Sequence, residues 1–488
     1  MESKTEPVCL RDYFLPFRNN IIGIDARIPA PYGTRPLIYL DWTASGRLYK
    51  PVEKKLIDDY GRFLGNTHTE TSFTGQFMTR AYHKAVEKIK SHVKAGGDYV
   101  LLQAGYGMTG AVNKLQRLLG LRVHEKYRES VLKTLPERPV VFVSRMEHHS
   151  NHISWLETLA ETVLIPQRDG YPDLQAFGEL LNRYDGRPLY LSLTACSNVT
   201  GIEPELKEFI RAIHARGGHA FVDYACSAPY TDMDLGGPVE ETPDAVMFSP
   251  HKFLGGPGTG GILIMRKSLY RNRIPDEPGG GTVVWTDPWE GAVYTDDIEA
   301  RETGGTPGFL LMIKTALAID LKEKMNPGRM RRREHELLER MFKGLDTLKG
   351  VQVLERDKTD RLGVVSIITP QLPYNGVVRL LNDLAGIQSR GGCSCAGTYG
   401  HYLLGLDRNI SREIKQQVLN GDSRRKPGWT RISIHPTTTE EEIDTLLETL
   451  EYILRKGKQL LEKDYTLQNG QFVHKTFRYE KFMPEVRL

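Results

Sequence analysis

The sequence predicts an α/β protein whose larger part is a mostly parallel sheet with helices on both faces. Short, almost wholly apolar runs alternate with amphipathic stretches through the middle of the chain, as in strand–helix repeats. The length of 488 residues is too great for one hydrophobic core and indicates two or three domains. A composition of 40% hydrophobic and 26% charged residues is typical of a soluble globular protein.

Each element of the larger part follows from its apolar pattern. Strands are expected at 98–103, 140–144, 189–193, 219–223, 245–249 and 260–265, and helices at 109–119, 173–184 and 205–214. The charged segment 121–138 is expected to be an exposed insertion.

A smaller α+β pattern follows a helix-rich stretch at 308–349. It has strands at 362–370 and 430–435 and helices at 375–385 and 439–456. We therefore expect four parts: an N-terminal segment (1–36), a large domain (37–325), a small domain (326–460) and a tail without assignment (461–488).

Charge and cysteine content exclude several classes of protein. A formal charge of +4 on this length predicts no nucleic-acid partner and no membrane-surface patch. The N-terminus has no apolar signal segment, and no run of about 18 apolar residues occurs, so secretion and membrane spanning are not expected. Cys9, Cys196, Cys226, Cys393 and Cys395 form no disulfide framework, which favours a cytoplasmic location.

Polar residues and glycines follow the predicted strands, where ligands of parallel sheets bind. Along the chain these strand ends read AGYGMTGAVN, RMEHHSNHISW, TACSNVTG, Asp223 and SPHK, the last ending at Lys252. Singly, each has an ordinary explanation as a turn, a helix cap or a solvated lysine. Together they match pyridoxal phosphate (PLP), which needs a Schiff-base lysine, an acid at its ring nitrogen and a helix N-terminus for its phosphate.

The order MEHHSNH, SNVTG, FVDYA, FSPHKFLGGPGTGG, GGTP, SRGGCSCAG and TRISI resembles class V aminotransferase-type enzymes of fold-type I. The resemblance covers roughly residues 37–455. It is greatest to group II cysteine desulfurases and to the desulfurase domain of molybdenum-cofactor sulfurases. The resemblance implies a PLP-binding large domain with a seven-stranded, mostly parallel sheet.

The resemblance also implies roles for single residues. Lys252 would be the Schiff-base lysine and would move the α-proton, Asp223 would pair with the ring nitrogen, and His148, with His149 beside it, would stack on the ring. Asn198 would contact the ring oxygen or the substrate. The expected phosphate ligands are Thr109, Gly110, Ser249 and His251, with Thr306 reaching the phosphate of the partner subunit in a homodimer. The expected substrate ligands are Arg431 for the α-carboxylate, Arg390 and His68.

Two features depart from these desulfurases. Cys226 stands where they usually have a glutamine, so a contact to the ring oxygen is lost or replaced. The segment 65–75 also differs from the usual loop, which predicts a substrate pocket of non-standard shape.

The cysteine pair in RGGCSCAG has several interpretations. The resembled desulfurases carry the motif R-x-G-x-x-C, and counting it from Arg390 implies that Cys395 would be the thiol that attacks the sulfur of bound cysteine and becomes a persulfide. A strained disulfide, a zinc site of Cys393, Cys395 and His401, and inert packing are the alternatives. No metal is expected.

The leading function is therefore a PLP-dependent cysteine desulfurase-like enzyme acting on L-cysteine or a related amino acid, with a sulfur-acceptor protein as a further partner. The alternatives are a C–S lyase on a cysteine conjugate or sulfoxide, or an aminotransferase or epimerase, all without a persulfide. A non-catalytic protein on the same fold is disfavoured by Lys252 and Asp223.

Overall fold

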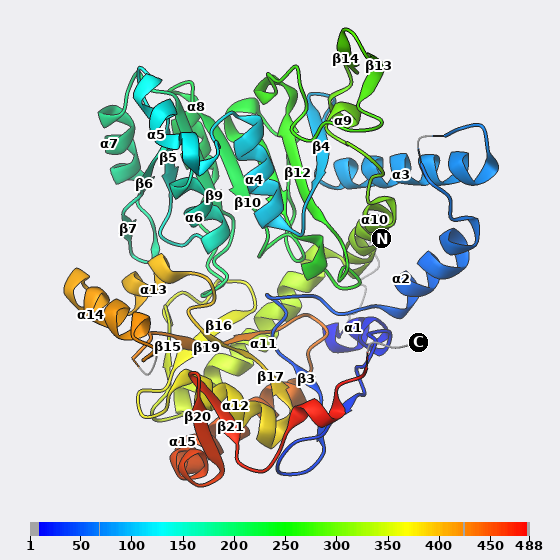
Figure 1. Ribbon diagram of the computed structural model, residues 1–488. Coiled ribbons are helices and arrows are strands. Elements are labelled where there is room, and N and C mark those ends of the chain that lie inside the picture. The colour runs from blue at the N-terminus through cyan, green and yellow to red at the C-terminus, as the bar shows by residue number, and fades with distance from the viewer. Residues whose placement is uncertain (1–8, 68, 423–424, 486–488) are drawn as a thin grey trace, which may run out of the picture. The chain divides into compact units, whose positions relative to one another are not determined.

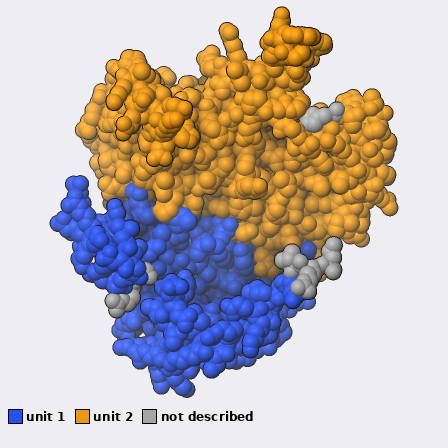
Figure 2. All heavy atoms as spheres, viewed as in Figure 1, with its two compact units in different colours: residues 1–44, 198–202, 328–488 blue, residues 45–197, 203–327 orange. Residues whose placement is uncertain are grey.

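The computed structural model describes residues 9–67, 69–422 and 425–485. The chain divides into two compact units, coloured in Figure 2. Unit 2 comprises residues 45–197 and 203–327, and unit 1 comprises residues 1–44, 198–202 and 328–488. The four parts expected from the sequence remain a prediction. The two units divide the chain differently, since unit 1 combines segments from near both ends of the sequence with a short internal stretch.

Unit 2 is built around a seven-stranded sheet, as predicted (Figure 1). Its strand order is β4 (Tyr99–Ala104), β12 (Gly261–Arg266), β11 (Ala245–Phe248), β10 (His219–Asp223), β9 (Leu189–Thr194), β5 (Val140–Val143) and β6 (Glu161–Leu164). Within this sheet only β12 runs opposite to the other six strands. The carboxyl ends of β4, β5, β9, β10 and β11 therefore meet at one edge of the sheet.

Both faces of this sheet are covered, which explains its apolar strands. Val141 packs in one core with Leu115 and Trp155, whereas the next residue, Phe142, packs in the other core with Phe177. The first core is closed by α4 (Met108–Leu118) and α6 (His149–Leu156). The second is closed by α3 (Phe73–His92), α7 (Leu174–Arg183), α8 (Lys207–His214) and α10 (Phe309–Met325).

The six strands expected from the sequence all form, with ends within one residue of the expected bounds. Strand β6 was not predicted because its sequence, ETVL, is short and its side chains are half-exposed or exposed. Segment 121–138 holds α5 (Glu125–Thr134), which has no buried residue, as an exposed insertion should. The remaining elements of unit 2 are α2 (Lys50–Lys55), α9 (Ile298–Arg301) and the strand pairs β7 (Gln167–Arg168) with β8 (Tyr171–Pro172) and β13 (Val283–Asp287) with β14 (Gly291–Tyr294).

Unit 1 has the expected α+β pattern. Its antiparallel sheet has the order β15 (Gln352–Val353), β16 (Val364–Ile368), β19 (Trp429–Ser433) and β18 (Arg390–Gly392). A single apolar core joins this sheet to α11 (Pro327–Thr347), α12 (Tyr374–Ala385) and α15 (Glu440–Asp464). A capping box of Thr439 and Glu442 starts α15, which continues beyond the expected end at 456.

The tail that the sequence left unassigned contains a hairpin of β20 (Tyr465–Gln468) and β21 (Gln471–His474). The other elements of unit 1 are α1 (Leu10–Asn19), β1 (Arg27–Ile28), β2 (Arg35–Pro36), β3 (Ile38–Tyr39), β17 (Ile387–Gln388), α13 (Gly397–Leu403) and α14 (Arg408–Leu419). Among the described residues, no helix has both the length and the apolar character needed to cross a membrane.

Candidate active site

Lys252 and Asp223 follow two neighbouring strands of the unit 2 sheet. Asp223 ends β10, is 3% exposed and accepts a hydrogen bond of 2.8 Å from the N–H of Ala225. Lys252 follows β11 in a single helical turn, whose backbone is fixed by a bond of 2.9 Å from the N–H of Gly46 to the carbonyl of His251. Burial raises the pKa of Asp223 to about 6, while the positive charge of Lys252 opposes this rise.

The N-terminus of α4 forms a cradle of suitable shape for an anion. The N–H of Met108 donates to Ser249 Oγ at 2.8 Å, and Gly107 has a φ of +99°. A Cβ at Gly107 would lie 2.9 Å from both Ser249 Oγ and His251 Cε1, so only glycine leaves this space open. Burial lowers the pKa of His251 to about 4, and its imidazole is therefore neutral at pH 7.

His148 is linked to this cradle through Ser150. The N–H of Ser150 donates to His148 Nδ1 at 3.1 Å, so His148 caps the N-terminus of α6. The hydroxyl of Ser150 lies 2.6 Å from that of Thr109. Gly110 has a packing role, because a Cβ there would lie 2.6 Å from the carbonyl oxygen of Ala104. Burial lowers the pKa of the neighbouring His149.

Sequence reasoning missed Glu147, which precedes His148 in MEHHSNH. Its carboxyl accepts hydrogen bonds from the Ser144 hydroxyl (2.6 Å), the Asn151 amide (2.7 Å) and the N–H of Thr194 (3.0 Å). It thereby ties the end of β5 to the end of β9. Burial, reinforced by the charge of Asp223, raises the pKa of Glu147 to about 7.

Unit 1 contains a second group of candidate residues, the arginine cluster of Asp41, Asn198, Arg390 and Arg431. Arg431 donates to Asp41 Oδ1 at 2.8 Å and to the carbonyl of Asn198 at 3.1 Å. Arg390 donates to Asp41 Oδ2 from Nη2 at 2.8 Å. Three of these residues were predicted; Asp41 was missed, although an acid directly after the apolar IYL stretch was a usable signal.

The loop of Cys393 and Cys395 is held in an unusual backbone conformation. Ser394 and Cys395 have φ values of +49° and +57°, which non-glycine residues rarely adopt. Ser394 is fixed on both sides: its carbonyl accepts from the Asn198 amide at 2.7 Å, and its hydroxyl accepts from Trp429 Nε1 at 3.1 Å. Cys395 is exposed, and both cysteines are free thiols.

Two of the three alternative interpretations of the cysteine pair, the disulfide and the zinc site, gain no support from the described residues; inert packing stays an alternative. Both ring nitrogens of His401 are engaged by Gly397 and Ser411, at 2.7 and 2.8 Å. No group of three or more His, Cys, Asp or Glu residues suited to a metal ion occurs in the described ranges.

Other predicted residues lie outside these two groups. Thr306 is exposed and accepts a hydrogen bond of 3.3 Å from the side chain of Asn66. His68 falls outside the described residues. Cys226 is buried, with its sulfur 3.8 Å from the carbonyl oxygen of Ser197.

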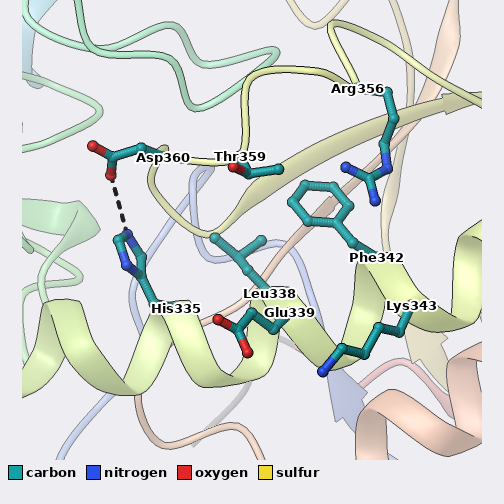
Figure 3. A pocket seen from close by; sticks show the side chains of 8 residues that line it. All are labelled: His335, Leu338, Glu339, Phe342, Lys343, Arg356, Thr359 and Asp360. Carbon is teal, nitrogen blue, oxygen red and sulfur yellow. Dashed lines mark ion pairs between the residues drawn. The ribbon is translucent and has the colours of Figure 1, made fainter.

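A pocket of about 410 Å³ in unit 1 does not involve the predicted residues (Figure 3). Leu338 and Phe342 of α11 form its apolar wall opposite Arg356 and Asp360. Two of its charged side chains already have partners: Asp360 accepts from Arg331 at 2.8 Å, and Arg356 donates to Asp346 at 2.9 Å. We therefore assign no catalytic role to this pocket.

Comparison with known proteins identifies the family. A model of the aminotransferase class-V family matches residues 38–446. The chain belongs to the class V aminotransferase family. This class V enzyme is 28% identical over 370 residues to a probable cysteine desulfurase of Halalkalibacterium halodurans, covering 74% of this chain and 84% of that protein. It is 27% identical over 424 residues to a probable cysteine desulfurase of Halobacterium salinarum, covering 86% and 92%.

Solved structures agree on the fold of this class V enzyme. The cysteine desulfurase of Thermococcus onnurineus matches with a TM-score of 0.70 at 24% identity, over 86% of this chain and 95% of that chain. A cysteine desulfurase of Escherichia coli matches with a TM-score of 0.70 at 22% identity, over 90% and 98%. The predicted fold, the PLP-dependent enzyme class and the similarity to cysteine desulfurases are confirmed.

Proposed function

We propose that this class V enzyme binds PLP and cleaves the C–S bond of L-cysteine or a related amino acid, with Cys395 receiving the sulfur. The observation that carries the proposal is the exposed Cys395 thiol in a loop fixed by Asn198 and Trp429. A nucleophile must be both accessible and positioned, and this loop provides both.

The residues of unit 2 fit PLP. The open space at Gly107, with Ser249 and the N–H of Met108, suits a phosphate group at a helix N-terminus. Asp223 would pair with the ring nitrogen, Lys252 would hold the cofactor covalently, and His148 would lie on the ring. Thr109 would add a hydroxyl to the phosphate site, and Asn198 of unit 1 would serve the ring oxygen or substrate. When bound, PLP withdraws electrons from the α-carbon of the amino acid and so weakens its bonds.

Different residues of the protein would then carry out the separate steps of the reaction. Arg431 and Arg390 would hold the substrate carboxylate, and Lys252 would move the proton at the α-carbon. The Cys395 thiolate would attack the substrate sulfur as the Cβ–S bond breaks. The bond's electron pair goes to Cβ, which takes a proton to give alanine, and the sulfur stays on Cys395 as a persulfide.

The test compares wild type, Cys395→Ala and Cys393→Ala with L-cysteine, measuring alanine, sulfide, pyruvate and ammonia together. We expect Cys395→Ala to lose at least about 100-fold in alanine formation because the attacking thiol is gone. Cys393→Ala, two residues away in the same loop, is the matched control and should retain most activity.

The products also distinguish the alternatives. Pyruvate and ammonia formed equally by wild type and Cys395→Ala would indicate a C–S lyase without a persulfide. Wild type that binds PLP but leaves L-cysteine unchanged would indicate that the substrate is a larger amino acid. Wild type that binds no PLP would refute the proposal as a whole.

The phosphate cradle gives a separate prediction. Gly107→Ala is expected to weaken PLP binding at least about tenfold, because the new Cβ fills the space between Ser249 and His251. Gly120→Ala is the matched control: Gly120 follows α4 at its other end, also has a positive φ, and has no atom within 4 Å of an added Cβ. Equal PLP affinity of the two variants, measured by equilibrium titration of the apoprotein, would contradict the assignment.

We also propose that the enzyme is a cytoplasmic homodimer that passes sulfur to an acceptor protein. The exposed Thr306, together with the exposed side chains of Ile57, Leu64 and Phe73 in unit 2, supports an interface between copies. All five cysteines lie outside disulfide bonds, which supports a reducing compartment. A single-chain mass in sedimentation would contradict the dimer.

A further inference from the structure

Two arginines of unit 1 lie side by side on neighbouring strands of its sheet. Arg390 of β18 and Arg431 of β19 are direct partners in the antiparallel register. Like charges in this position destabilise a strand pair unless an opposite charge separates them.

Asp41 supplies that opposite charge. One of its carboxylate oxygens accepts from Arg431 Nη2 at 2.8 Å, and the other accepts from Arg390 Nη2 at 2.8 Å and Nε at 3.1 Å. The backbone of Asp41 is fixed by a bridge to Ser433 on β19. The carboxylate thus joins two cations, and the three side chains together carry one net positive charge.

The cluster retains unused hydrogen-bonding groups. Arg431 is 3% exposed; its Nη1 and Nη2 are engaged by Asn198 and Asp41, but its Nε is buried and has no hydrogen-bond partner among the described residues. Asn198 is 6% exposed; its amide nitrogen donates to Ser394, but its Oδ1 is buried and accepts no hydrogen bond from any residue that the structure describes. Burying a donor and an acceptor without partners is costly, so this pair of atoms points to a ligand that satisfies both.

We propose that Asp41 determines substrate specificity by cancelling one of the two arginine charges, so that the cluster accepts an amino acid with one carboxylate and discriminates against a dicarboxylic one. This inference rests on the proposed function, since it concerns the substrate of that enzyme. A single carboxylate balances the remaining positive charge. A second carboxylate finds the charge of Arg390 already neutralised by Asp41, and the Asp41 carboxylate repels it.

The charge count makes opposite predictions for two single variants. Asp41→Asn raises the net charge of the cluster to two and releases Arg390, which then pairs with a second carboxylate. Arg390→Gln lowers the net charge of the cluster to zero and leaves Asp41 to repel a second carboxylate. Arg390 has a half-exposed side chain, so its replacement is compatible with folding.

The experiment measures dissociation constants of L-alanine and L-aspartate for the PLP-loaded enzyme by calorimetry. These ligands differ by one carboxylate, and L-alanine is the product of the proposed reaction. Asp41→Asn should shift the affinity ratio toward L-aspartate about tenfold, and Arg390→Gln should shift it toward L-alanine. The double variant Asp41→Asn with Arg390→Gln restores a net charge of one and should return the ratio to within about threefold of wild type.

The outcomes separate this inference from the proposed function. Wild type that binds neither amino acid would refute the amino-acid function itself. Wild type that binds L-alanine, with an unchanged ratio in Asp41→Asn or in Arg390→Gln, would overturn the role of Asp41. A double variant whose affinity ratio lies further from the wild-type ratio than that of either single variant would indicate that Asp41 acts only as a structural support.

Discussion

Lys252→Ala is expected to lower alanine formation from L-cysteine at least about 1,000-fold. In the proposed reaction Lys252 both holds PLP and moves the α-proton, so its removal affects two steps. Stability should change little, because Lys252 is only partly buried and its turn is held by the backbone bond from Gly46 to His251. The measurement is the initial rate of alanine formation, together with the PLP content and thermal midpoint of each variant.

Lys267→Ala provides the control for Lys252. Lys267 is an exposed lysine that follows the next strand along the chain, β12, and it has no role in the proposed reaction. It should keep wild-type rates and PLP content. Retention of PLP and of more than about a tenth of the activity in Lys252→Ala would refute the assignment of the Schiff-base lysine.

Asp223→Asn should lower activity at least about 100-fold and stabilise the PLP-free protein. Burial raises the pKa of Asp223 from 3.8 to about 6, so the folded protein retains this proton at pH values where the unfolded chain has lost it. The free energy of unfolding of wild type therefore falls as the pH rises from about 4 to about 6. Asparagine does not titrate, and at pH 7 the apo variant should be more stable by on the order of 3 kcal/mol.

Urea denaturation of both apoproteins between pH 4 and pH 7 tests the Asp223 prediction. The difference in the free energy of unfolding should grow from about pH 4 to about pH 6 and then stay constant. Asp296→Asn is the control, because its side chain is fully exposed, and it should show no such growth. A difference independent of pH would mean that Asp223 is already ionised in the folded apoprotein.

The sheet of unit 2 was predictable because its strands are continuous apolar runs between clear turn signals. Strand β6 was not, since a short edge strand such as ETVL carries little hydrophobic signal. The full length of α15 was also missed: the helix was expected to end at 456 but continues to Asp464 through GKQLLEKD, where only the two leucines give a hydrophobic signal.

The candidate residues were predictable where a family motif contains them, as with Lys252, Asp223 and Cys395. The supporting residues were not. Asp41 lies more than 300 positions before its arginine partners, and no sequence pattern reports a pairing at that separation. Glu147 accepts hydrogen bonds from residues 144, 151 and 194, and the sequence does not indicate that these three donors lie close together.

The make-up of unit 1 affects how the chain acquires its structure. The strand segment before Ala44 and the stretch 198–202 are synthesised long before residues 328–488, which supply all four strands of the unit 1 sheet. Non-local pairing of this kind slows folding, because the loop must close before its contacts form. Asp41 and Asn198 must therefore remain without their partners until Arg390 and Arg431 leave the ribosome. The arginine cluster therefore cannot be completed until the chain has been synthesised past Arg431.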